Sequence, residues 1–424
     1  MSLKYLHTTI RLLTMFLIAG LAVVTQAAET DADRIASLEA RAAAMAAELE
    51  TLRQELKNAQ QGAAASSETA LRRDVDKAIA TAQAAEKNSR EWKESAGVTH
   101  LAGYASADYM DAEGEPGYFT ANFNPMFHYM YRDIVLWESE LEVEVDENGE
   151  TEVGLEYSTI DLFLNDSLTL MAGKFLSPLG QFRQNLHPSW INKLPSAPVG
   201  FGHDGAAPEA EIGLQARGGI RIGEASRFGY SLYVGNGPKL EVEDGEIHGI
   251  ETGGFAGNSD DENVFGGRLS FLPIPRLEFG LSGAIGKVVI TEADGEDVEG
   301  DPSRDYDVLG ADASWQLGSL DLRAEYIQQK IGSDDLSMVP EGGTWETWYA
   351  QGAYKFGRGK WEAVARYGDY SSPHPDQDQE QVAIGLNYLI APHAIVKLGY
   401  EFNDGLSGEL TDADRLLLQL AYGF

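Results

Sequence analysis

Apolar and polar residues alternate with a period of two over most of the chain from about residue 97 to the C-terminus. This alternation predicts β-strands that have one apolar and one polar face. Sixteen candidate strands cover roughly residues 98–109, 118–131, 134–145, 150–164, 167–177, 211–222, 227–236, 263–272, 277–291, 306–317, 320–331, 344–356, 360–370, 380–390, 393–403 and 414–424. The number is even, as in single-chain bacterial outer-membrane barrels.

The connections between these strands alternate between short and long. The short ones are Arg132-Asp133, Asn165-Asp166, Gly223 to Ser226, Pro273 to Arg276, Gly318-Ser319, Gly357 to Gly359 and Ala391 to His393. Outer-membrane barrels place short turns in the periplasm and long loops outside the cell. The alternation therefore predicts a sixteen-stranded antiparallel transmembrane β-barrel, of the all-β class, with both ends of the barrel domain in the periplasm.

The polar faces of the strands carry charges of both signs. In the strand at 134–145, Glu138, Glu140, Glu142 and Glu144 share one face while Trp137, Leu141 and Val143 share the other. Basic residues fall on the presumed inner faces of other strands, at Arg217, Arg221, Arg268, Arg323, Arg366 and Lys397. A solvated sheet surface explains any one such strand, but their repetition predicts a water-filled lumen that these ten side chains line.

The connection at residues 178–210 is the longest and carries many large apolar side chains between prolines. Loops surrounded by water seldom hold so many apolar groups, so we expect this loop to pack against other parts of the molecule. If it folds into the barrel mouth, Arg183, His187, Lys193 and His203 are the candidates for a pore constriction. Packing against a neighbouring subunit is the alternative.

The N-terminal part of the chain has a different character. Residues 1–27 combine a basic start, an apolar run and a small-x-small exit, as in a secretory signal peptide. Residues 28–62 carry an apolar heptad stripe that predicts a parallel, self-associating coiled coil, here placed in the periplasm, and residues 63–96 a helical linker. An amphipathic helix folded back on the barrel is the alternative for the stripe.

The chain ends in Leu416-Leu417-Leu418-Gln419-Leu420-Ala421-Tyr422-Gly423-Phe424. Its alternation presents Leu416, Leu418, Leu420 and Tyr422 to lipid, and a terminal aromatic suits the membrane interface. This ending resembles the signal by which the barrel-assembly machinery recognises bacterial outer-membrane proteins. Phe424 is thus the expected contact with that machinery.

Composition excludes several functions. A net charge of −35 argues against nucleic acid as a partner, and the absence of cysteine excludes disulfides and thiolate metal chemistry. The acids gather between strands, around residues 241–246, 260–262 and 294–301, which predicts solvated outer loops; cation bridging to lipopolysaccharide is the alternative. We expect no cofactor, no metal site and no enzyme, because Ser189 near His187 and Ser372 near His374 lie in no recognisable catalytic motif.

Four segments carry a family resemblance. They are Ala172-Gly173-Lys174-Phe175 with Pro178-Leu179-Gly180, then His187-Pro188-Ser189-Trp190, then Gly213-Leu214-Gln215-Ala216-Arg217-Gly218, and Tyr233-Val234-Gly235-Asn236-Gly237. Over residues 97–424 the chain resembles trimeric outer-membrane porins of the phosphate-selective O and P family and their dicarboxylate-type relatives with coiled-coil arms. The resemblance implies a homotrimer that passes small hydrophilic solutes and favours anions. The interleaved glutamates weaken any expectation of strict phosphate selectivity.

The sequence therefore predicts a passive diffusion channel in the bacterial outer membrane, with a modest preference for anions such as phosphate or small carboxylates. Outer-membrane lipid, lipopolysaccharide and small solutes are the other expected partners. The alternative is a structural barrel that tethers the envelope through its coiled coil. The two hypotheses can be distinguished because an anchor barrel should be plugged or narrow, whereas a diffusion channel needs an aqueous pore.

Overall fold

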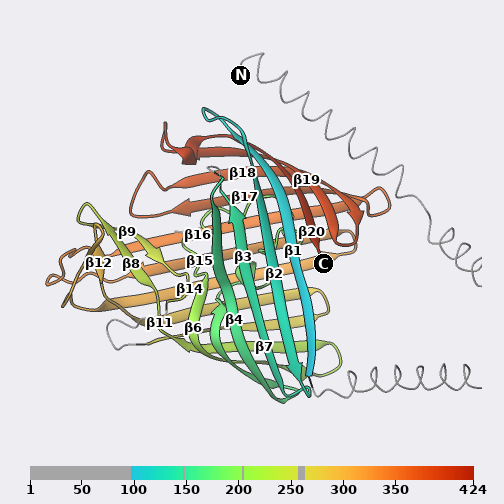
Figure 1. The fold of residues 1–424 in the computed structure, drawn as a ribbon, viewed down its shortest axis with the longest axis horizontal. Helices are drawn as coiled ribbons and strands as arrows, with labels where there is room; N and C mark the ends of the chain where they lie inside the picture. The colour runs from blue at the N-terminus through green and yellow to red at the C-terminus, as the bar shows by residue number, and fades with distance from the viewer. Residues whose placement is uncertain (1–96, 147–148, 203–204, 256–262) are drawn as a thin grey trace, which may run out of the picture. The chain divides into compact units, whose positions relative to one another are not determined.

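The chain folds into a closed antiparallel β-barrel in the computed structural model, which describes residues 97–146, 149–202, 205–255 and 263–424. The ring runs β1-β2-β3-β4-β5-β6-β7-β10-β11-β14-β15-β16-β17-β18-β19-β20 and closes where β20 pairs with β1. Each strand pairs with its neighbours in the ring, so no edge is left open to lipid (Figure 1). The predicted barrel of sixteen strands is confirmed.

The barrel strands are β1 (Gly97–Ala112), β2 (Tyr118–Tyr131), β3 (Val135–Val145), β4 (Thr151–Asn165), β5 (Leu168–Leu176), β6 (Ala210–Ile222), β7 (Ser226–Gly235), β10 (Val264–Ile274), β11 (Leu277–Val288), β14 (Arg304–Leu317), β15 (Leu320–Ile331), β16 (Gly343–Phe356), β17 (Trp361–Ser371), β18 (Gln379–Ala391), β19 (Ala394–Gly405) and β20 (Arg415–Gly423). These bounds differ from the predicted ones by at most about three residues, because period-two alternation defines a strand well wherever lipid and water face its two sides.

The two faces of the wall differ in polarity. Large apolar side chains such as Phe119, Leu281 and Leu309 are exposed on the outer face, where lipid covers them. Near the short turns, the outer face carries exposed aromatic side chains at Tyr131, Trp137, Trp315, Tyr354 and Trp361. Aromatic residues prefer the level of the lipid headgroups, so this row marks one membrane interface.

Two small hairpins stand in the long connections and were not predicted. β8 (Lys239–Glu243) pairs with β9 (Glu246–Glu251), and β12 (Glu292–Ala293) pairs with β13 (Glu296–Asp297); β8, β9 and β12 lie toward the left in Figure 1. The first hairpin buries Leu240, Val242, Ile247 and Ile250. The acidic segment around residues 241–246 is thus not merely a solvated loop, because its apolar residues join the apolar cluster inside the barrel.

Helices are short in the part of the chain that the structure describes. α4 (Phe182–Asn185) lies in the β5–β6 connection and the 3-10 turn η1 (Leu410–Asp412) precedes β20. No helix among these residues is long and apolar enough to cross a membrane. The predicted signal peptide at 1–27, coiled-coil arm at 28–62 and helical linker at 63–96 lie outside the described residues.

The C-terminal residue completes the closure of the barrel. The backbone N–H of Phe424 donates to the Gly103 carbonyl at 2.9 Å, and the Gly103 N–H donates to the Phe424 carbonyl at 3.1 Å. The Phe424 ring stacks 6.2 Å from the Phe123 ring, and Tyr422 is 51% exposed on the outer face. The last residues therefore both close the ring and contact the membrane.

We expect deletion of Phe424, or Tyr422→Asp, to lower the amount of protein in the outer membrane while leaving secretion intact. The deletion removes the closing backbone pair, and the substitution places a charge on the lipid face, which costs about 1 kcal/mol near an interface and more at greater depth. Immunoblots of membrane fractions and heat-modifiable mobility measure the effect. Tyr422→Phe is the control and should insert normally; normal insertion of the first two variants would show that the ending is only a strand.

Candidate pore and constriction loop

The connection between β5 and β6, residues 177–209, crosses the interior of the barrel. It leaves the wall at β5, yet several of its polar contacts are with β16, β17 and β18, which are not neighbours of β5 in the ring. The Thr347 hydroxyl on β16 donates to the Val199 carbonyl at 2.6 Å, and the Asn387 amide on β18 donates to the Lys193 carbonyl at 2.8 Å. The Lys193 ammonium lies 3.0 Å from Glu362 of β17. We call this segment the inner loop.

Apolar packing holds the inner loop to the same wall. Leu194 is buried in a small cluster with Ala353, Val364 and Ala383. Farther along, the Phe201 ring packs edge-on against Tyr349 of β16, with ring centroids 5.2 Å apart, and belongs to the larger cluster that includes the β8–β9 hairpin. Burial of these side chains explains why so apolar a loop does not stay in water.

A buried carboxylate on β15 anchors the start of the inner loop. Glu325 accepts the backbone N–H groups of Gln181 at 3.0 Å and Phe182 at 3.1 Å. Gly180, next to them, has φ +84, and a Cβ there would lie 1.7 Å from a Glu325 carboxylate oxygen. Only glycine fits this position, since it alone tolerates both the left-handed backbone and the close approach of the carboxylate.

The predicted constriction residues Arg183 and His187 lie in a packed layer between the inner loop and β4. Arg183 is 3.1 Å from Glu156 and 3.5 Å from Glu209, while His187 is 3.8 Å from Glu156. Burial alone would lower the pKa of Arg183, but the neighbouring glutamates raise it above its ordinary value. Burial lowers the pKa of His187 to about 4, so its imidazole is neutral at physiological pH. His203 lies outside the described residues.

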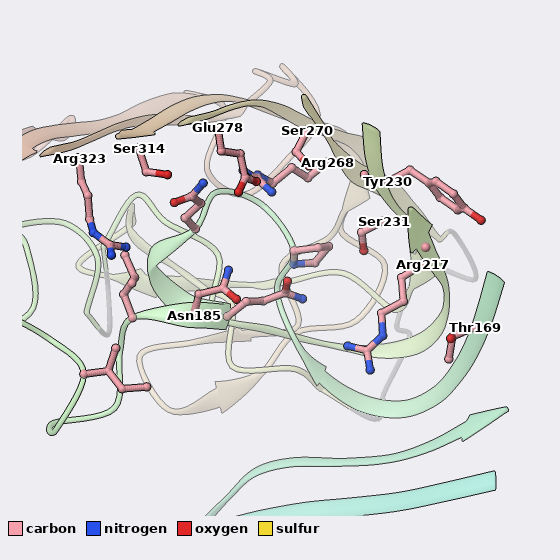
Figure 2. A pocket seen from close by; sticks show the side chains of 17 residues that line it. Thr169, Asn185, Arg217, Tyr230, Ser231, Arg268, Ser270, Glu278, Ser314 and Arg323 are labelled. Carbon is pink, nitrogen blue, oxygen red and sulfur yellow. The ribbon is translucent and has the colours of Figure 1, made fainter. Parts of the chain in front are cut away.

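A cavity of 710 Å³ lies inside the barrel beside the inner loop. Three arginines line it, Arg217 from β6, Arg268 from β10 and Arg323 from β15. Figure 2 shows Arg217 and Arg323 on opposite sides of the cavity, with Asn185 of the inner loop between them. The rest of the lining is mostly amides, hydroxyls and glycines: Thr169, Gln181, Gln184, Gly218, Gly229, Tyr230, Ser231, Ser270 and Ser314.

Each of these arginines has a carboxylate partner. Arg217 lies 2.6 Å from Asp161, and Arg323 lies 2.8 Å from Asp321. Arg268 bonds to Asp312 at 2.6 Å and also to Glu278 at 2.8 Å. Arg217 keeps the most contact with water, with 39% of its side chain exposed. The pairs hold the guanidinium groups against the wall, where their remaining N–H groups face the cavity.

Lys193 lies at a second cavity of 320 Å³, which it lines together with Lys355 and Glu362. This cavity also touches Trp190 of the inner loop and Ile395 of β19. Of the four predicted constriction residues, Lys193 thus faces open space, whereas Arg183 and His187 are mostly buried.

The inner loop covers two of the predicted lining residues. Arg366 donates to the Ala197 carbonyl at 2.8 Å, and the Lys397 ammonium donates to the Leu194 carbonyl at 3.3 Å; both side chains are buried. They hold the loop rather than line the open lumen, a correction to the expectation from the strand pattern. Alternation assigned them correctly to the inner face but carries no information about what covers that face.

The four predicted glutamates of β3 and Arg221 occupy varied positions. Glu140 is fully buried in the wall, whereas Glu138, Glu142 and Glu144 are partly accessible. Arg221 of β6 is exposed near the short turn that follows it. The anchoring role of Glu325 was not predicted from the sequence. Gly180, which lies among larger residues of the inner loop, was the one feature that could have indicated a close contact there.

A closed barrel with an apolar outer belt, a polar cavity inside and a loop folded across the interior is the architecture of an outer-membrane diffusion channel. Residues 137–407 match the Gram-negative porin family. The chain belongs to that family, which places it in the outer membrane and identifies it as a channel for small solutes rather than an enzyme.

Solved structures share the fold. OmpT of Vibrio cholerae lacking loop L8 gives a TM-score of 0.52 at 11% identity, covering 78% of this chain and 100% of that one. An anion-selective porin from Comamonas acidovorans gives 0.52 at 15% identity, covering 77% and 100%. The outer membrane channel DcaP of Acinetobacter baumannii gives 0.51 at 11% identity, covering 78% and 98%. No curated protein sequence matches this chain.

Proposed function

We propose that the protein is a passive diffusion channel with a modest preference for small anions such as phosphate or small carboxylates. The observation that carries this proposal is the internal cavity of 710 Å³ with Arg217, Arg268 and Arg323 around it. A small anion passing through it meets guanidinium N–H groups from several sides, together with amide and hydroxyl donors from the inner loop and the wall.

The preference is modest because acids share the interior. Every arginine at the cavity has a carboxylate partner, and β3 adds a row of glutamates on its inner face. Fields of opposite sign across a pore sort solutes by dipole and size more than by charge alone. The resemblance to phosphate-selective porins therefore supports the architecture better than strict selectivity for phosphate.

We further propose a homotrimer whose N-terminal coiled coil stands in the periplasm. The heptad stripe at residues 28–62 supports self-association, and a structural neighbour of Vibrio cholerae is described as a trimer. Chemical cross-linking in mild detergent measures the assembly state. Only monomers of the full-length protein would contradict the proposal, and a deletion of residues 28–62 should leave a foldable barrel that assembles less readily.

Planar-bilayer recording of the purified protein tests the channel itself. A tenfold gradient of potassium chloride should give discrete conductance steps and a reversal potential on the anion side of zero. Steps with a reversal potential on the cation side would keep the channel and overturn the anion preference. The absence of any steps from correctly folded protein would favour the envelope tether instead.

A further inference from the structure

We propose that the inner wall carries a transition-metal site made by His100 of β1 and His128 of β2, with Glu138 of β3 orienting His128. The three residues stand directly opposite one another on adjacent strands, since His100 pairs with His128 and His128 pairs with Glu138 in the strand register. They form one row across the wall, close to the turn between β2 and β3. We call this row the histidine row.

The histidine row faces the interior of the barrel. Phe127 and Tyr129, on either side of His128, are 37% and 43% exposed on the outer face, so alternation directs His128 inward. Trp137 is likewise exposed on the outer face next to Glu138. The side chains of His128 and Glu138 are 24% and 21% exposed, and His100 is exposed as well. Water and dissolved ions can therefore reach the row.

The distance between the two imidazoles suits a metal chelate. The Nδ1 atoms of His100 and His128 lie 3.4 Å apart, and the ring centroids lie 5.5 Å apart. Two imidazole nitrogens bound to one tetrahedral Zn²⁺ at about 2.0–2.1 Å are separated by about 3.4 Å. The two Nδ1 atoms thus already have the spacing of neighbouring ligands. Their contact is a hydrogen bond in which one Nδ1 carries the proton, so metal binding requires that proton to move to Nε2 of the same ring.

Glu138 acts on the opposite nitrogen of His128. Its carboxylate lies 3.8 Å from His128 Nε2. A small rotation of the Glu138 side chain brings its carboxylate within hydrogen-bond distance of Nε2, which would favour the tautomer with the proton on Nε2 and leave the lone pair on Nδ1 free for a metal. Glu138 is therefore a positioning residue of the site, and its oxygens do not need to touch the ion.

The ligand type and number define the class of metal. In the described ranges, no group of three or more His, Asp or Glu side chains is arranged to hold a metal ion, so the site is a two-nitrogen chelate completed by water. Imidazole nitrogen favours Zn²⁺, Ni²⁺ and Cu²⁺ over Mg²⁺ and Ca²⁺, which prefer oxygen ligands. We expect open, micromolar-range binding rather than a closed structural site.

Calorimetric titration of Zn²⁺ into the full-chain protein, purified in detergent without a histidine tag, tests the proposal. Wild type should bind one Zn²⁺ per chain at pH 7.5, while Ca²⁺ should not compete. His100→Gln and His128→Gln should each weaken binding at least about tenfold, because each removes one of two ligands. Glu138→Gln should weaken it about tenfold, the usual loss when a residue that orients a ligand is removed.

The second histidine pair of the described chain supplies the matched control. His248 of β9 and His374 of the β17–β18 connection have ring centroids 5.2 Å apart. His374→Gln should leave Zn²⁺ binding unchanged. Unchanged binding in His128→Gln, or loss of binding in His374→Gln alone, would overturn the proposal. Heat-modifiable mobility of each variant verifies folding, and weaker wild-type binding at pH 5.5 is expected because imidazole must be neutral to bind a metal.

Discussion

Replacing Arg217 and Arg323 together by glutamine is expected to move the reversal potential toward cations. These two side chains stand on opposite sides of the cavity and are the more accessible of its three arginines (Figure 2). A charge about 8 Å from a passing ion changes the energy of that ion by about 2 kcal/mol at an effective dielectric constant of about 20, and salt reduces this. We expect the ratio of anion to cation permeability to fall about two- to fivefold in bilayer recordings.

Charges outside the cavity supply the control. Glu296 and Asp297 of β13 are exposed in an outer connection, and salt screens such charges within about 8 Å. Glu296→Gln with Asp297→Asn should leave the reversal potential nearly unchanged, although the variant alters as many charges. Glu278→Gln, at the cavity, should shift it toward anions. A larger effect of the outer acids than of the cavity residues would show that ions do not pass through the cavity that Arg217, Arg268 and Arg323 line.

Local alternation was sufficient to predict the barrel wall. The bounds of a strand such as β15, Leu320–Ile331, could be predicted from the sequence. Its lipid-facing side requires apolar residues, whereas its inner side can carry charged ones. Ring closure also followed, since an open sheet edge would leave backbone N–H and C=O groups without partners in lipid.

The contents of the barrel could not be predicted in the same way. The β8–β9 hairpin contacts the β17–β18 connection, where His374 Nε2 lies 2.7 Å from the Ile247 carbonyl and the Gln377 amide donates to the His248 carbonyl at 2.9 Å. These contacts join segments more than a hundred residues apart in the chain. The acids around Leu240 and Val242 predict a solvated loop, because the sequence alone does not show that these two alternating apolar residues are buried.

In the candidate site, too, the strand faces could be predicted from the sequence, whereas the position of the inner loop could not. Alternation assigned Arg217, Arg268 and Arg323 to the inner face, where they line the cavity. It equally assigned Arg366 to that face, but the inner loop covers this side chain. Which inner-face charges meet water depends on where the loop docks. That position is set by contacts such as those of Glu325 and Leu194, which no local pattern encodes.

Glu325→Ala is expected to detach the start of the inner loop and give a larger, noisier conductance. The substitution removes the carboxylate that accepts the N–H groups of Gln181 and Phe182, at 3.0 and 3.1 Å, inside the packed cluster. Each buried N–H left without a partner costs about 1–3 kcal/mol. A net change of about 2 kcal/mol multiplies the population of the detached loop about thirtyfold. Single-channel recordings should show this as a higher mean conductance and more frequent flicker.

Two further variants separate loop anchoring from a simple change of charge. Glu325→Gln keeps the length of the side chain and one of its two oxygen acceptors next to Gly180, so its flicker should lie between those of wild type and Glu325→Ala. Glu278→Gln removes a carboxylate at the cavity that bonds to the wall residue Arg268, and it should change selectivity without adding flicker. If Glu325→Ala folds normally and conducts as quietly as wild type, the inner loop is held by its apolar contacts at Leu194 and Phe201, and the carboxylate is not its anchor.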